Sequence, residues 1–168
     1  HPTRSMVSPD VFIPLAEEIG VIGELGLLVL ENACQVVSQW RSAGHSLYVS
    51  VNVSALQIPN LLTPSIVLEA LKRHGLPNDA IVIEITEGVL MGNIGTALEW
   101  MAELGAAGLR IYLDDFGTGY SSLSYLKRFP LHAVKIDKSF IRDLAEDSHD
   151  KALVNAIITM ATSLTLDV

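Results

Sequence analysis

The polar residues best suited to chemistry lie where apolar, strand-like segments end. In the stretch Leu109–Asp137, the adjacent carboxylates Asp114 and Asp115 end one alternating segment, and Lys135 lies with Asp137 in the next. Ionisable side chains on one face of an otherwise apolar strand are costly to bury unless they face water, a metal ion or each other. A structural ion-pair cluster is one interpretation, and a functional site at the strand ends is the one we favour.

Two earlier segments end in the same kind of residue. Leu47–Ser54 alternates apolar and polar residues and contains Asn52, and Ala80–Glu87 contains Glu84. The carboxyl ends of parallel strands meet at one rim of an α/β barrel, where active sites form. Carboxylates gathered there repel one another unless divalent cations are bound, and all-oxygen ligands favour Mg²⁺ or Mn²⁺. Two such ions suit attack of water on a phosphodiester, with Lys135 placed to orient that water.

Each of these residues also has a structural explanation. Asn52 would satisfy a backbone turn, Glu84 would pair with Lys135, and Asp114 would cap the next helix. Gly117-Thr118-Gly119 lacks the lysine and the spacing of a phosphate-binding loop, so we interpret it as a mobile loop that lets the two aspartates approach metal ions. The five histidines show no metal-ligand spacing.

The segments that must position these residues repeat in a regular order. Asn52, Glu84 and Asp114 follow one another at intervals of about 30 residues, a usual length for one βα unit. We therefore expect a helical start, four β-α units and the beginning of a further strand. The expected strands are Leu47–Ser54, Ala80–Glu87, one ending at Asp114 and Ala133–Lys138, with a stub at Thr165–Val168; the expected helices are Val11–Ile19, Val21–Ala43, one opened by Pro64, Thr96–Gly105 and Asp150–Ser163.

Composition supports a single α/β domain over residues 1–168. The chain is 49% hydrophobic and only 6% aromatic, and its mean hydropathy of +0.39 suits aliphatic strands buried on both faces of a parallel sheet. A net charge of -8 argues against a DNA or RNA partner. The single Cys34 cannot form an internal disulfide, so we expect it to be core filler in a cytoplasmic protein. Polar residues interrupt the longest apolar run, Gly20–Val37, so it is not a membrane span.

The chain resembles the EAL domain, the bacterial cyclic-di-GMP phosphodiesterase family. The Asp-Asp-Phe-Gly-Thr-Gly loop followed by Lys-Ile-Asp is the most specific part of this resemblance. It implies a modified TIM barrel that hydrolyses cyclic-di-GMP to linear 5′-pGpG with two Mg²⁺ or Mn²⁺ ions. The matching stretches, in family order, are PDVFIPLAEEIG (Pro9–Gly20), VNVSALQ (Val51–Gln57), IEITEG (Ile83–Gly88), DDFGTGYSSLSYLKR (Asp114–Arg128) and KIDKSFI (Lys135–Ile141).

The resemblance implies roles for the residues at the strand ends. Asn52, Glu84 and Asp114 would be metal ligands, with Asp114 bridging the two ions. Asp115 would serve the second metal or its water, and Lys135 would hold the attacking water. These roles follow from the matching motifs.

Further roles implied by the resemblance concern the surrounding loops. Glu87 would act in catalysis by steadying the loop 116–126, which in this family links the metal site to a dimer interface. Gln57 and Asp137 are additional candidates for substrate contact. The loop residues assigned to this coupling are Phe116, Gly117, Thr118, Gly119, Tyr120 and Ser121.

The resemblance also implies that the chain is part of a domain. The family's Glu-Ala-Leu signature would precede His1, a segment with a catalytic-site glutamate would follow Val168, and a complete barrel has about 250 residues. We therefore expect an incomplete barrel of about four parallel strands with open edges, which self-associates as a homodimer or by domain swapping. We also expect weak or no hydrolysis by this chain alone.

Two other functions remain open from the sequence. A non-catalytic receptor would bind cyclic-di-GMP or a protein partner, and an unrelated metal-dependent barrel lyase or aldolase would not respond to the nucleotide. Domains of the EAL family are usually fused to sensory or diguanylate-cyclase modules, some of them membrane-anchored. Such modules are therefore the expected partners in a parent chain.

Overall fold

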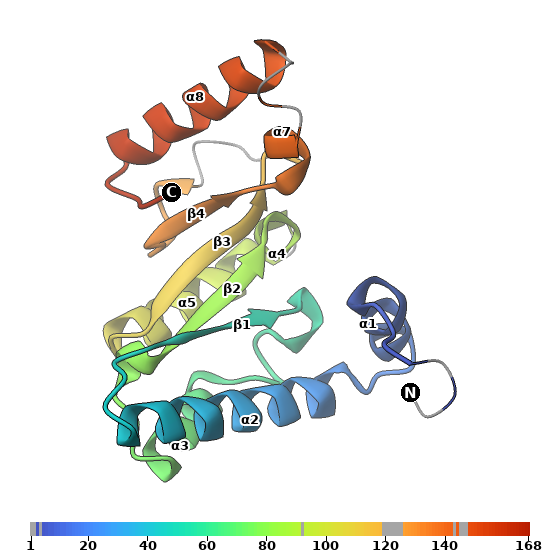
Figure 1. The fold of residues 1–168 in the computed structure, drawn as a ribbon, viewed down its shortest axis with the longest axis vertical. Coiled ribbons are helices and arrows are strands. Elements are labelled where there is room, and N and C mark those ends of the chain that lie inside the picture. Colours follow the sequence, from blue (N-terminus) through green and yellow to red (C-terminus); the bar gives the residue numbers. More distant parts are fainter. Residues whose placement is uncertain (1–2, 4, 92, 119–125, 143, 145–147) are drawn as a thin grey trace.

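Four parallel strands form the centre of the described part of the chain (Figure 1). The computed structural model describes residues 3, 5–91, 93–118, 126–142, 144 and 148–168. The strands pair in the order of the sequence, as expected when each strand is followed by a helical crossover. They are β1 (Val49–Val53), β2 (Ile81–Thr86), β3 (Arg110–Phe116) and β4 (Ala133–Ile136).

Helices precede the sheet and connect its strands. The long helix α2 packs against β1, α5 against β3, and α8 against β4. Figure 1 shows α1 at the margin of the molecule, near the start of α2 and the carboxyl end of β1. The helices and 3₁₀ turns are α1 (Pro9–Glu18), α2 (Ile22–Ser42), η1 (Ala55–Gln57), α3 (Pro64–Arg73), η2 (Asn78–Ala80), α4 (Glu87–Met91), α5 (Ile94–Ala106), α7 (Lys138–Arg142) and α8 (Ser148–Ser163).

Local sequence signals explain where several helices begin. Pro9 occupies the first turn of α1, where its missing N–H costs nothing. The Thr63 hydroxyl accepts from the N–H of Ile66 at the start of α3, and the Asn93 side chain accepts from the N–H of Thr96 at the start of α5. Such caps satisfy backbone donors that the first helical turn leaves unpaired.

The two faces of the sheet differ in character. One face is covered by helices, and the side chains of Ile83, Ile85, Ile111 and Leu113 on it have no solvent exposure. The opposite face has Asn52, Glu84, Asp114 and Lys135, as the period-two alternation predicts. The sheet therefore separates an aliphatic core from a polar face.

The expected α/β class and the expected strands and helices are confirmed, although β1, β2 and β4 are shorter than the sequence suggested and β3 runs on past the two aspartates to Phe116. The strand stub at 165–168 is reduced to one parallel bridge, between Ala133 and Asp167. A Glu-Ala-Leu tripeptide does occur, at Glu69–Leu71, but it lies inside α3 with Ala70 and Leu71 buried, so it is not a site motif. No helix in the described part of the chain is both long and apolar enough to cross a membrane.

Candidate functional site

Strand register brings the predicted site residues together. Asn52 on β1 is the direct partner of Glu84 on β2, and Thr86 on β2 is the partner of Asp114 on β3. Because side chains two residues apart share a face, Glu84 and Thr86 form successive levels of one polar surface. The predicted site residues therefore lie together towards the carboxyl ends of β1 to β4.

Lys135 connects two carboxylates from different strands. Its ammonium donates to Glu84 Oε2 at 2.8 Å and to Asp114 Oδ2 at 2.9 Å. Glu84 is only 5% exposed, so its charge depends on this partner. Burial lowers the pKa of Lys135, but the hydrogen bonds to both carboxylates outweigh it and raise the pKa above its ordinary value. The ion pair that the sequence offered as a structural alternative is thus present within the site.

The adjacent aspartates lie at a bulge at the end of β3. The register between β3 and β4 shifts between Leu113 and Phe116. Asp115 has a φ of 54°, and its N–H donates to the Asp114 side chain at 2.9 Å. A bulge redirects side chains at a strand end. The two carboxylates consequently leave the strand in different directions.

Asp115 is paired with Asp137 rather than with Lys135. Burial raises the pKa of Asp115, and the neighbouring charges of Asp114 and Asp137 raise it further. Hydrogen bonds from Ser139 lower the pKa of Asp137, whose carboxylate accepts from the Ser139 N–H at 2.8 Å at the start of α7. Asp137 therefore acts as a helix cap and as a partner of Asp115, and its predicted contact with substrate stays a prediction.

Glu87, predicted to steady the loop, and Gln57, predicted to contact substrate, are both buried. Glu87 is 4% exposed and begins α4 directly after β2, and α4 lies against β3. Gln57 is 2% exposed, and its Oε1 accepts from the Ser54 N–H at 2.9 Å. These contacts give Gln57 a structural position, and its predicted role in substrate binding remains a prediction.

The structure describes part of the loop 116–126, which was predicted to link the metal site to a dimer interface. Phe116 is 5% exposed, and the Thr118 hydroxyl donates to the Asp115 carbonyl at 2.9 Å. Gly117 lies so close to Phe140 that an added Cβ would be 2.9 Å from its ring. The remaining coupling residues, Gly119, Tyr120 and Ser121, lie outside the described residues.

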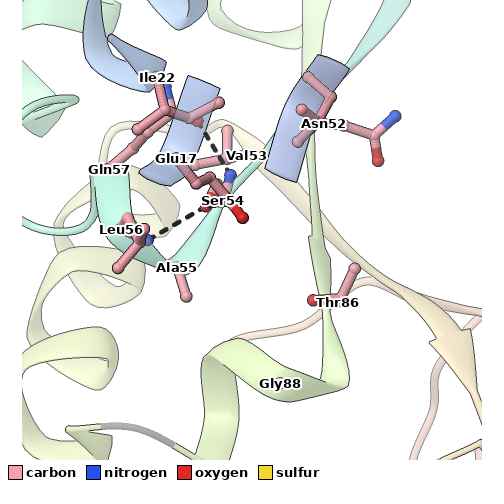
Figure 2. Close-up of a pocket in the computed structure, with 11 residues that line it drawn as sticks. Glu17, Ile22, Asn52, Val53, Ser54, Ala55, Leu56, Gln57, Thr86 and Gly88 are labelled. Atoms are coloured by element: carbon pink, nitrogen blue, oxygen red, sulfur yellow. Dashed lines mark hydrogen bonds between the residues drawn. The ribbon is translucent and has the colours of Figure 1, made fainter. Parts of the chain in front are cut away.

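A cavity of about 440 Å³ lies beside the site, between α1 and the ends of β1 and β2 (Figure 2). Sequence reasoning missed three of its polar lining residues, Glu17, Ser54 and Thr86. Thr86 had a detectable signal, because it shares the period-two face of Glu84. No sequence pattern pointed to Glu17, because its position beside Ser54 depends on how α1 packs near the end of β1.

The donor atoms at the site suit a hard divalent cation. Asn52, Glu84 and Asp114 supply an amide and two carboxylates, the oxygen ligands that Mg²⁺ and Mn²⁺ prefer. Among the described residues, no three His, Cys, Asp or Glu side chains lie close enough together to hold a metal ion. The chemistry of the donor set fits the expected metal, whereas the described carboxylates alone do not complete its coordination.

A parallel sheet whose strands pair in sequence order, with polar residues towards their carboxyl ends, defines an α/β protein and is typical of TIM-barrel-like folds. A family model described as the EAL domain matches residues 1–168. The chain belongs to the EAL domain family, as the sequence motifs predicted. Membership of this family argues against the unrelated lyase or aldolase.

Curated relatives from Pseudomonas aeruginosa are similar over the whole chain. The protein named bifunctional diguanylate cyclase/cyclic di-GMP phosphodiesterase MucR is 41% identical over 169 residues, covering 100% of this chain and 25% of the relative. The protein named cyclic di-GMP phosphodiesterase NbdA is also 41% identical over 169 residues, covering 100% of this chain and 22% of the relative. The chain thus spans about a quarter of these relatives.

Solved structures show the same fold. The structure described as PaMucR phosphodiesterase in complex with c-di-GMP has a TM-score of 0.94 and 42% identity, covering 99% of this chain and 68% of that chain. The EAL domain of Mycobacterium smegmatis DcpA has a TM-score of 0.80 and 38% identity, covering 87% of this chain and 66% of that chain. These neighbours confirm the barrel-like architecture.

Proposed function

We propose that the chain is a phosphodiesterase domain that hydrolyses cyclic-di-GMP to linear 5′-pGpG. The observation that carries this proposal is the placement of Lys135 between Glu84 and Asp114, at 2.8 and 2.9 Å. A lysine ammonium at the strand ends can stabilise charge that develops on a phosphoryl group, and the two carboxylates beside it offer oxygen ligands to the divalent cations of phosphoryl transfer. The names of MucR and NbdA, each 41% identical to this chain, support the choice of substrate.

In this proposal, the residues divide the work of hydrolysis. Asn52, Glu84 and Asp114 hold a divalent cation, with Asp115 serving a second one. Bound Mg²⁺ or Mn²⁺ ions supply electrostatic stabilisation of the phosphoryl oxygens and lower the pKa of water. Lys135 orients the water whose oxygen forms the new bond to phosphorus.

The bond between phosphorus and the ribose 3′-oxygen then breaks. The proton that the water loses passes to Asp115 or to solvent, and the leaving 3′-oxygen is released as a hydroxyl after protonation. One phosphodiester anion thereby becomes a terminal 5′-phosphate with one additional negative charge. We expect weak or no hydrolysis by this chain, because among the described residues only two carboxylates, Glu84 and Asp114, meet at the lysine.

The direct test is hydrolysis of cyclic-di-GMP, followed chromatographically with Mg²⁺ and with Mn²⁺. We expect the Asp114→Asn variant to lose about 100-fold or more of any turnover, because it removes a proposed metal ligand. Asp79→Asn is the matched control, since Asp79 lies before the opposite end of β2 with its side chain 66% exposed. Equal turnover by wild type and the Asp114 variant would contradict the proposed site.

A cyclic-di-GMP receptor without catalysis is the second candidate. The observation that favours it is that the Lys135 ammonium bonds to Glu84 and Asp114, the two carboxylates that the enzyme would use as metal ligands. A receptor would bind the nucleotide equally well with and without divalent cations and would release it unchanged. Calorimetric titration with and without EDTA therefore separates the receptor from the enzyme.

The relatives also suggest how the domain is used. Because the chain covers 25% of MucR, whose name includes a diguanylate cyclase, we propose sensory or diguanylate-cyclase modules as covalent partners, and a homodimer as the assembled form. The single buried Cys34 supports a cytoplasmic location.

A further inference from the structure

Hydrogen bonds close the turn that follows Asn52. β1 ends at Val53, and the chain turns at once into η1. The Ser54 N–H donates to Gln57 Oε1 at 2.9 Å, and the Ser54 hydroxyl oxygen accepts from the Leu56 N–H at 3.2 Å (Figure 2). The first bond is partly buried, and Gln57 is only 2% exposed. The turn is therefore fixed within two residues of a proposed metal ligand.

The Gln57 amide fits against the backbone of α2. A Cβ at Gly26 would lie only 1.8 Å from Gln57 Nε2, a distance that no real side chain adopts. A glycine at this point of the helix therefore leaves the space that the amide occupies. The backbone carbonyl of Gln57 also accepts from the N–H groups of Leu61 and Leu62, both at 2.9 Å. These bonds tie the turn to the segment that follows it.

Helix α1 holds the same turn from the other side. The Ser54 hydroxyl donates to Glu17 Oε1 at 2.5 Å. Within the described residues β1 pairs with β2 alone, so only one edge of the strand is fixed by a ladder of backbone bonds. The contacts with α1 and α2 supply the remaining restraints at its carboxyl end.

We propose that Gln57 is a positioning residue for Asn52, held by Gly26 and Ser54 so that the Asn52 amide stays aimed at the metal site. This inference rests on the proposed metal-dependent phosphodiesterase function. Asn52 is exposed between Val51 and Val53, which are 3% and 4% exposed. In Figure 2 its side chain points away from the turn that Gln57 closes. Movement of the turn would therefore rotate the strand end and redirect this amide.

The test compares variants that disturb the turn in different ways. Gln57→Met keeps the length and approximate volume of the side chain but removes the acceptor for Ser54. Gly26→Ala displaces the Gln57 amide without changing its chemistry, and Glu17→Ala is a milder variant at a partly exposed residue. Gln35→Met is the matched control, since Gln35 is exposed on the same helix as Gly26. Thermal melts establish that each variant is folded.

The first readout is the Asn52 side-chain amide signal in ¹⁵N-labelled, metal-free protein, assigned by its loss in Asn52→Asp. We expect Gln57→Met and Gly26→Ala to shift this signal and increase its mobility, whereas Gln35→Met leaves it unchanged. The second readout is the Mn²⁺ concentration that broadens the signal by half. We expect this concentration to rise about 10-fold in Gln57→Met, as for other residues that orient metal ligands, and by less in Glu17→Ala.

Two results would overturn the positioning role. One is a folded Gln57→Met or Glu17→Ala variant with a lower melting temperature but an unchanged Asn52 signal and Mn²⁺ response, which would make Gln57 merely structural. The other is a wild-type Asn52 signal that Mn²⁺ does not broaden. Hydrolysis of cyclic-di-GMP by wild type is measured separately. Absent hydrolysis with an intact Mn²⁺ response would count against turnover by this chain and leave the positioning role standing.

Discussion

At the scale of single residues, Lys135 determines the electrostatics of the site. It lies 51 residues after Glu84 and 21 after Asp114 in the chain, yet it donates to both carboxylates. Glu84 is nearly buried, whereas the Lys135 side chain is 42% exposed. The lysine therefore compensates a buried charge while still reaching solvent, where a substrate would arrive.

Replacing Lys135 with methionine should abolish measurable hydrolysis of cyclic-di-GMP. Methionine keeps the length of the side chain but removes the charge that is proposed to orient water. We expect a loss of about 100-fold to 1,000-fold, the usual effect of removing one stabilising donor. The assay is chromatographic, with the exposed Lys72→Met as control. A Lys135→Met variant that retained full turnover would show that the lysine serves only the fold.

The same lysine should make stability depend on alkaline pH. Its pKa is raised in the folded state from an ordinary value of 10.5, so its stabilisation is fully present below pH 10.5 and is lost as pH rises through the folded value. In urea unfolding at pH 7, Lys135→Met should be less stable than wild type by about 1–2 kcal/mol. This difference between wild type and Lys135→Met should shrink as the pH rises above 10.5. A difference independent of pH would contradict the charge pairing.

Cys34 should be unreactive while the protein is folded. Burial, aided by the negative charge of Glu31, raises the pKa of the Cys34 thiol to about 11, and the side chain has no solvent exposure. Because the thiolate is the reactive species, a disulfide reagent at pH 8 should label the native chain only as fast as it unfolds. In urea, labelling should reach one thiol per chain. Complete labelling of native protein within seconds would refute the burial.

At the scale of elements, the end of β3 is the most constrained segment of the site. The bulge at Asp115 separates the two carboxylates, and Gly117 follows with a φ of 103°. A Cβ added at Gly117 would lie closest to the ring of Phe140 in α7 and next closest to Ile157 in α8. The backbone directly after β3, at Gly117, is thereby packed against α7 and α8, the two helices that follow β4.

Gly117→Ala should therefore cost more stability than a glycine substitution that meets only backbone strain. Gly44 also has a positive φ, 90°, but an added Cβ there would meet nothing within 4 Å. We expect about 1 kcal/mol for Gly44→Ala and about 2–3 kcal/mol for Gly117→Ala, where contact with Phe140 adds to the strain. Urea unfolding of both variants measures the difference. Equal losses would mean that Phe140 moves aside without cost.

At the scale of the whole molecule, the sheet is open in the described part of the chain. β1 pairs only with β2, and the outer edge of β4 carries one bridge, at Ala133. Several apolar side chains of α1 are exposed, among them Val11 at 65% and Leu15 at 53%. Exposed edges and apolar surface favour association with other chains.

We accordingly expect the chain to self-associate. Sedimentation velocity over a range of micromolar concentrations should give a mass above the 18.2 kDa of one chain, increasing with concentration. Because the exposed apolar surface of α1 is expected to contribute to association, Leu15→Glu should reduce the average mass in solution. Gln35→Glu, at an exposed residue of α2, should leave this mass unchanged. A single monomeric species at every concentration, with a cooperative thermal melt, would contradict this expectation.

The sequence alone determined which residues share a face and, to within two residues, where the strands end. Alternation with a period of two is a local property, so Glu84 and Asp114 were placed on the polar face without any knowledge of tertiary contacts. The repeat of about 30 residues likewise predicted parallel strands. Fold class and the candidate site at the carboxyl ends followed from these two local patterns and from the family motifs.

Only the tertiary structure decided which side chains meet. Lys135 pairs with Glu84 and Asp114 because strand register, set by backbone bonds between distant segments, brings their side chains to the same place. Asp115 turns away because of a bulge, and Gln57 is buried because α2 leaves it space at Gly26. Such contacts depend on the packing of elements that are far apart in sequence, and no local pattern specifies them.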